Sequence, residues 1–246
     1  MPAKASLEHP LLQLIRAKEH LESLDAAVSM FHTSEPTTVS VLEDPTNGIK
    51  ALQVKIPVPH ARLGLIAGDV FMALRSSLDY LMWQLALLTT ENPHRRTEFP
   101  VIWRVNGETE SRLADITKDL PSGAVEEVKG LQPHLRGDAY RSDPLWQIDE
   151  ICNIAKHKVI PVQGASLEFD ATITHEDIAS TRMERLGEMV FVLTAEGSAK
   201  LKLAPQASAG VLFGDDQSGI KINRREIRSL YEYVKEAVFP KFYRFF

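Results

Sequence analysis

Apolar residues recur every three or four positions in two long stretches of the chain, which is typical of helices that bury one face. The first stripe consists of Leu14, Ala17, Leu21, Leu24, Val28 and Phe31. The second consists of Phe71, Leu74, Leu78, Leu81, Leu85 and Leu88. These patterns predict helices over residues 10–32 and 62–89.

A third helix is predicted by its own start signal. Asp143 is a good N-cap residue, and Pro144 fits the first helical position. The apolar face that follows consists of Leu145, Ile148, Ile151, Cys152, Ala155 and Val159. We expect this helix over residues 143–158, since Pro161 cannot continue it. Shorter helices are expected over residues 111–120 and 121–131.

The remaining segments are typical of β-structure. Residues 37–42 and 49–58 flank Asn47-Gly48, which is a strong signal for a hairpin. From residue 159 to 223, short β-branched runs alternate with Gly, Pro, Asp and Ser, which predicts an antiparallel sheet. A last helix is expected over residues 224–239.

These elements define an α+β fold. We expect a helical bundle core with a β-hairpin insertion, followed by a small antiparallel sheet and a C-terminal helix. The prediction is a single compact domain of residues 1–246, with a helical core at about 9–160 and a β-rich part with the C-terminal helix at about 159–246.

Composition supports a globular protein of the cytoplasm. The 246 residues are 44% hydrophobic and 25% charged, with a net charge of −5. The most apolar run, residues 80–88, is too short to span a bilayer, which needs about 20 residues. A lone cysteine, Cys152, excludes an intramolecular disulfide and fits a reducing compartment. We therefore expect a cytoplasmic location and no membrane partner.

Common catalytic signatures are absent from the sequence. The chain lacks Gly-x-Ser-x-Gly, His-Glu-x-x-His and Gly-x-Gly-x-x-Gly. Cys152 lies on an apolar helix face, which predicts a buried, unreactive thiol. The expectation is no cofactor and no metal, and whether the protein is an enzyme stays open.

One polar constellation stands out on two of the predicted helices. On the second helix, Arg75 and Asp79 are four residues apart and lie between Met72 and Trp83 on the helical wheel. On the third helix, Asn153 and His157 also point the same way. Lys156 and Lys158 flank His157 near the helix end, where the helix dipole favours cations.

Residues 74–80 (LRSSLDY) and 153–158 (NIAKHK) carry a resemblance to known sequences. They resemble two motifs of a family of uncharacterised bacterial proteins, which read L-R-S-x-L-D-H and N-x-x-K-H-R, with residues 97–100 (TEFP) between them. A more remote similarity is to the helical HEPN class, many of which are metal-independent ribonucleases with Arg and His on one helix. This chain has no Arg-x4–6-His, so such chemistry would take His157 from the other helix.

Three interpretations of the constellation compete. In the first, Arg75, Asp79, Asn153 and His157 form a mainly structural hydrogen-bond network between two helices. In the second, a groove formed by Arg75, Asp79, Asn153, Lys156, His157 and Lys158 binds an anionic ligand or nucleotide. In the third, the protein is a HEPN-like ribonuclease. Its catalytic candidates are His157 as general acid or base, Asp79 as its orienting group, and Arg75, together with Lys158, as stabiliser of the phosphate charge. Asp79 and His157 are expected within direct or one-water reach.

The C-terminus combines aromatic and basic residues. The set is Tyr231, Tyr233, Lys235, Phe239, Lys241, Phe242, Tyr243, Arg244, Phe245 and Phe246. Such a segment fits a surface for nucleic acid or for a protein partner. The alternative is a helix packed on the sheet with its aromatic tail buried.

Overall fold

The computed structural model describes residues 5–43, 50–174, 182–185, 190–195, 200–217 and 219–246. The described helices are α1 (Glu8–Ser34), α2 (Ala61–Ala86), α3 (Gly107–Thr117), α4 (Ser122–Gly130), α5 (Pro144–His157) and α6 (Arg224–Tyr233). The described strands are β1 (Thr38–Glu43), β2 (Lys50–Lys55), β3 (Val162–Thr174), β4 (Arg182–Arg185), β5 (Val190–Ala195), β6 (Lys200–Asp215) and β7 (Ile220–Asn223). The structure confirms the α+β class.

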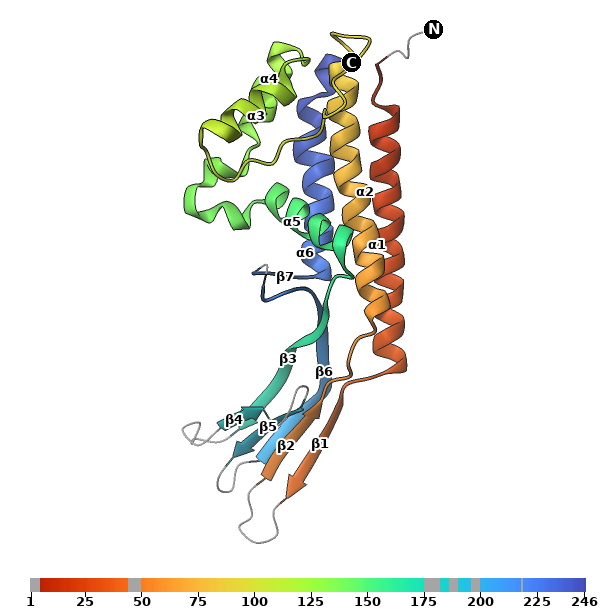
Figure 1. Ribbon diagram of the computed structural model, residues 1–246. Coiled ribbons are helices and arrows are strands. Elements are labelled where there is room, and N and C mark those ends of the chain that lie inside the picture. The colour runs from red at the N-terminus through yellow and green to blue at the C-terminus, as the bar shows by residue number, and fades with distance from the viewer. Residues whose placement is uncertain (1–4, 44–49, 175–181, 186–189, 196–199, 218) are drawn as a thin grey trace.

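The long helices form the body of the molecule. Figure 1 shows α1, α2 and α6 lying side by side, with α5 crossing next to α2 and α6 and with α3 and α4 outside them. Every residue of the predicted first stripe is buried, from Leu14 to Phe31. Core residues of α1, α2, α5 and α6 belong to one hydrophobic cluster. The two stripes therefore bury against each other, as their spacing predicts. Leu88 is the exception: α2 ends at Ala86 rather than near the expected residue 89, and Leu88 is exposed.

Helix starts follow the capping chemistry of the sequence. The Asp143 carboxylate accepts a hydrogen bond from the Leu145 N–H at 2.9 Å, which confirms Asp143 as the N-cap of α5. Asn223 and Glu226 form a reciprocal capping box at α6. Between α4 and α5, the segment Pro133–Ser142 forms 3-10 turns on either side of Gly137, whose φ of 56° favours glycine.

Two antiparallel sheets complete the fold. β1 and β2 form the expected hairpin, with Val39 opposite Val54, while its Asn47-Gly48 turn lies outside the described residues. The hairpin is not a separate insertion, because β2 also pairs with β5, giving the order β1-β2-β5-β4. A second sheet has the order β3-β6-β7. The short β-branched runs at residues 200–203 and 211–213 belong to the single long strand β6.

The sheets reach the helical core mainly at one end. Val211 and Phe213 of β6 and Ile220 and Ile222 of β7 belong to the hydrophobic cluster. Figure 1 shows β1, β2, β4 and β5 extending away from the helices. The candidate site residues belong to the helical part, because they lie on α2 or on α5 and its C-cap.

The expected C-terminal helix changes its winding before its end. α6 ends at Tyr233 and continues as a π-helical turn, Val234–Val238, followed by short 3-10 turns. Phe239 and Phe242 are fully buried, while Tyr243 and Phe246 are exposed. Arg244 and Lys241 contact the Glu127 carboxylate of α4 at 2.7 and 3.4 Å. The structure thus packs much of the tail into the core.

Candidate functional site

Arg75 and Asp79 of α2 hold both polar backbone groups of Phe99. The Arg75 Nη2 atom donates a hydrogen bond to the Phe99 carbonyl at 2.7 Å and lies 3.1 Å from the Asp79 Oδ1 atom. The Phe99 N–H donates to the same Asp79 oxygen at 2.9 Å. Phe99 itself is fully buried. Because a buried backbone group without a partner is costly, this clamp fixes the irregular segment 97–101 against α2.

A third carboxylate reaches Arg75 from α5. The Asp149 Oδ1 atom lies 3.4 Å from the Arg75 Nη1 atom, and the Asn153 amide donates to the other Asp149 oxygen at 3.3 Å. The Arg75 side chain is only 9% exposed, and its Nη1 atom makes no hydrogen bond among the described residues. A buried guanidinium nitrogen without a hydrogen bond is rare, and the N–H groups of Nη1 can still donate to an acceptor.

Arg75 lines a small polar cavity, here called the Arg75 cavity. Its volume is about 200 Å³, and it is lined by Arg75, Glu98, Val101, Arg112, Asp149, Asn153 and Lys156. Arg112 of α3 pairs with Glu98 at 2.7 Å. Lys156 makes no hydrogen bond or ion pair with any described residue. The cavity therefore contains one cation whose charge no direct partner balances.

Three predicted site residues, Asp79, His157 and Lys158, do not line this cavity. His157 ends α5, is exposed, and makes no hydrogen bond or ion pair among the described residues. Lys158 pairs with Asp215 of β6 at 2.6 Å. The carboxylate of Asp79, which was expected to meet His157, is instead bound by Arg75 and by the Phe99 amide. The structure thus brings Arg75, Asp79, Asn153 and Lys156 together, and it offers no direct contact between Asp79 and His157.

Three residues of the site were missed by the sequence reasoning. Glu98 and Phe99 lie in the TEFP segment, which was singled out only as text between two motifs. Arg112 lies on the weakly predicted helix, and no local pattern connects it with Arg75. Asp149 lies four residues before Asn153 on α5, so the helical spacing places the two side chains on the same side of the helix.

Burial changes the protonation of Asp79. It raises the pKa of the Asp79 carboxyl above its usual value, and the opposing effects of Arg75 and the Phe99 N–H compensate only in part. The folded protein therefore holds this proton more tightly than the unfolded chain does. The Asp79 contribution to stability is largest below the unfolded pKa and is lost as the pH rises through the raised folded pKa.

This linkage gives a testable pH dependence. As the pH is raised from about 4, near the usual carboxyl pKa, to neutral, wild type should lose stability relative to Asp79→Asn, because the amide does not ionise. Urea denaturation of both proteins at several pH values measures the difference. A difference that stays constant across this range, or that moves in favour of wild type, would contradict the raised pKa.

The single cysteine shows no sign of activation. Cys152 is buried, its Sγ atom lies 3.4 Å from the Met72 sulfur, and burial raises the pKa of its thiol. A raised pKa disfavours the nucleophilic thiolate. Cys152 is thus a core residue of α5.

Comparison with known proteins adds no assignment. No known protein family, curated protein or solved structure matches the chain. The resemblance of residues 74–80 and 153–158 to a bacterial family, and the remote HEPN similarity, therefore stay predictions. Among the described residues, no group of three His, Cys, Asp or Glu side chains is placed to hold a metal ion, and no helix is long and apolar enough to cross a membrane.

Proposed function

We propose that the protein binds a small anionic ligand through the Arg75 cavity, and that the ligand presents a phosphate or carboxylate group to it. The observation that carries this proposal is the Nη1 atom of Arg75, a residue that lines the cavity: this atom is buried and makes no hydrogen bond among the described residues. Arginine is well suited to such groups, because its planar fork donates two parallel hydrogen bonds to carboxylate or phosphate oxygens.

The other cavity residues fit the same ligand. Lys156 has no direct ionic partner, and the Asn153 amide can turn from Asp149 towards an incoming oxygen. Arg75 and Arg112 are paired with carboxylates, so Lys156 carries the positive charge at the cavity that no direct partner balances. A volume of about 200 Å³ is below the roughly 300 Å³ at which pockets for whole small molecules begin. The cavity therefore holds the anionic group, with the rest of the ligand outside.

The contacts also support a structural role for the same side chains. Arg75 and Asp79 anchor the segment 97–101 whether or not a ligand is present. The ribonuclease alternative gains no support from the geometry, because a general acid or base must lie within hydrogen-bonding reach of the reacting group. His157 is exposed and lies outside the cavity lining. We therefore propose binding without catalysis. A cytoplasmic location belongs to this proposal, because the only cysteine is a buried free thiol.

Inorganic phosphate is the simplest probe of this site. We expect wild type to bind phosphate at millimolar affinity, and Lys156→Gln to weaken binding about fivefold, since it removes one charge-assisted hydrogen bond at an exposed position. Asp149→Asn should instead tighten binding, because it removes the carboxylate that competes for Arg75. Isothermal titration calorimetry at constant ionic strength measures all three affinities.

Lys158→Gln is the matched control. Lys158 is two residues from Lys156, but it pairs with Asp215 and does not line the cavity. Its replacement should leave phosphate affinity within twofold of wild type, since surface pairs contribute little. Equal losses in the two lysine variants would mean that phosphate senses only the general surface charge. That result, or the absence of any binding, would refute the proposal.

A further inference from the structure

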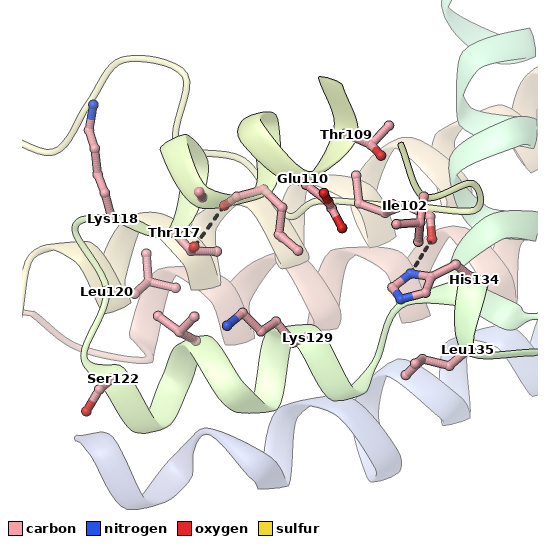
Figure 2. A pocket seen from close by; sticks show the side chains of 14 residues that line it. Ile102, Thr109, Glu110, Thr117, Lys118, Leu120, Ser122, Lys129, His134 and Leu135 are labelled. Atoms are coloured by element: carbon pink, nitrogen blue, oxygen red, sulfur yellow. Dashed lines mark hydrogen bonds between the residues drawn. The ribbon is translucent and has the colours of Figure 1, made fainter. Parts of the chain in front are cut away.

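A second and larger cavity lies between α3 and α4. Its volume is about 730 Å³, within the usual range for small-molecule sites. Half of its lining residues are apolar: Ile102, Val105, Leu113, Ala114, Leu120, Val125 and Leu135. Figure 2 shows the cavity between the two helices and the segment that carries Ile102, with Leu120 among the side chains that line it. None of its lining residues lines the Arg75 cavity, so this site is independent of the proposed function.

Of the three charged side chains that line this cavity, the two lysines have ionic partners and the glutamate has none among the described residues. Lys118 contacts Asp115 at 2.8 Å, and Lys129 contacts Glu126 at 3.1 Å, so both lysines already have a carboxylate on their own helix. Glu110, in the first turn of α3, lines the cavity but its carboxylate makes no hydrogen bond or ion pair with any described residue. The unbalanced charge at the cavity is therefore negative.

His134 supplies a second free acceptor. Its Nδ1 atom lies 3.2 Å from the Ile102 carbonyl oxygen, which can only accept a hydrogen bond. The Nδ1 atom must therefore carry the proton, and in the neutral ring the Nε2 atom keeps its lone pair. The backbone N–H of His134 donates to the same carbonyl at 2.9 Å, which fixes the residue in place. Figure 2 shows the hydrogen bond from the His134 ring to the Ile102 carbonyl and the ring at the cavity wall.

We propose that the cavity binds an amphipathic monocation, namely a primary amine with an apolar chain. The ammonium group donates to the Glu110 carboxylate and to the His134 Nε2 atom, which are both acceptors and have no partner among the described residues. The apolar chain replaces water along Leu113, Leu120 and Val125, and burial of this surface provides most of the affinity. An ammonium has three N–H donors and no acceptor, so its hydrogen-bonding pattern is the complement of the site.

Three probes with the same chain and different head groups test this proposal. Octylamine is cationic at neutral pH, octanol is neutral and octanoate is anionic. The expected order of affinity for the wild-type protein is octylamine, then octanol, then octanoate. Calorimetry, with ligand-observed NMR for the weakest probe, measures the three values. A tighter affinity for octanoate would assign the head-group site to the lysines and would overturn the proposal, as would the absence of octylamine binding in the millimolar range.

Variants locate the binding within the cavity. Glu110→Gln keeps the size of the side chain and removes its charge, so octylamine binding should weaken roughly tenfold or more, while octanol binding should hardly change. Glu108→Gln is the matched control, since Glu108 is exposed in the same helical turn and does not line the cavity. Equal effects of the two glutamine variants would refute the role of Glu110.

A cavity-filling variant tests the location without any change of charge. Ala114 is an exposed residue of α3 that lines the cavity, so Ala114→Leu should fold normally and take up part of the space. We expect all three probes to lose affinity together in this variant. Octylamine binding that is unchanged in Ala114→Leu would place the ligand elsewhere on the protein and would overturn the proposal.

Discussion

Arg75→Met is expected to destabilise the folded protein by about 2–4 kcal/mol. The change removes the donor to the Phe99 carbonyl and leaves two carboxylates, those of Asp79 and Asp149, without their common cation. Both carboxylates are about one-third exposed, so the loss should be smaller than for a fully buried ion pair. Equilibrium denaturation in urea at neutral pH measures this difference.

His157→Ala is the control for that experiment. Its side chain is exposed and has no hydrogen-bond or ionic partner among the described residues, so we expect a change within about 0.5 kcal/mol. The effects of Asp79→Asn and His157→Ala should then add, since residues without a shared contact rarely couple. Strong non-additivity, or an Arg75→Met effect below about 1 kcal/mol, would contradict the cluster described above.

Gly64→Ala is expected to cost about 2–3 kcal/mol, although alanine is the better helix former by about 1 kcal/mol. A Cβ atom on Gly64 would lie 2.1 Å from the Ile160 carbonyl oxygen. The obstacle is backbone just before β3, which cannot turn aside as the end of a side chain can. Thermal and urea denaturation of the variant measure the loss.

Gly68→Ala, one turn further along α2, is the matched control. Its Cβ would meet the Ala155 Cβ at 3.4 Å, an ordinary van der Waals contact. This variant should be as stable as wild type or up to about 1 kcal/mol more stable, since it gains helix propensity without a clash. Similar effects of the two substitutions would mean that α2 and the residues before β3 are not as close as the structure places them.

Local patterns were enough to predict most elements of the helical part. The spacing from Leu14 to Phe31 identified α1 and its buried face, and Asp143 identified the start of α5. Arg75 and Asp79 were recognised as unusual because apolar Met72 and Trp83 flank them on the helical wheel. In each case the deciding interaction lies within one helix, where sequence spacing maps directly onto space.

The parts of the fold and of the site that the sequence did not predict depend on contacts between distant segments. The partner of Arg75 and Asp79 is the backbone of Phe99. Every residue type has the same backbone C=O, and all but proline have the N–H, so no sequence pattern can identify such a partner. His157 shares a helical wheel position with Asn153, but spacing does not say which part of α5 the neighbouring helix covers. The pairing of β2 with β5 is likewise invisible, because each strand alone fits a hairpin or an edge.

The pairing of β2 with β5 also sets an order of events during synthesis. β1 and β2 pair locally, but Val54 of β2 must wait for Phe191 of β5, and more than half of the chain is made between them. Until then, the second edge of β2 offers unpaired N–H and C=O groups, which favour pairing with other chains. The sheet should therefore assemble after α1 to α5 have been made, and non-local pairing of this kind is slow. A nascent chain held on the ribosome before residue 190 is expected to be the form most prone to aggregation.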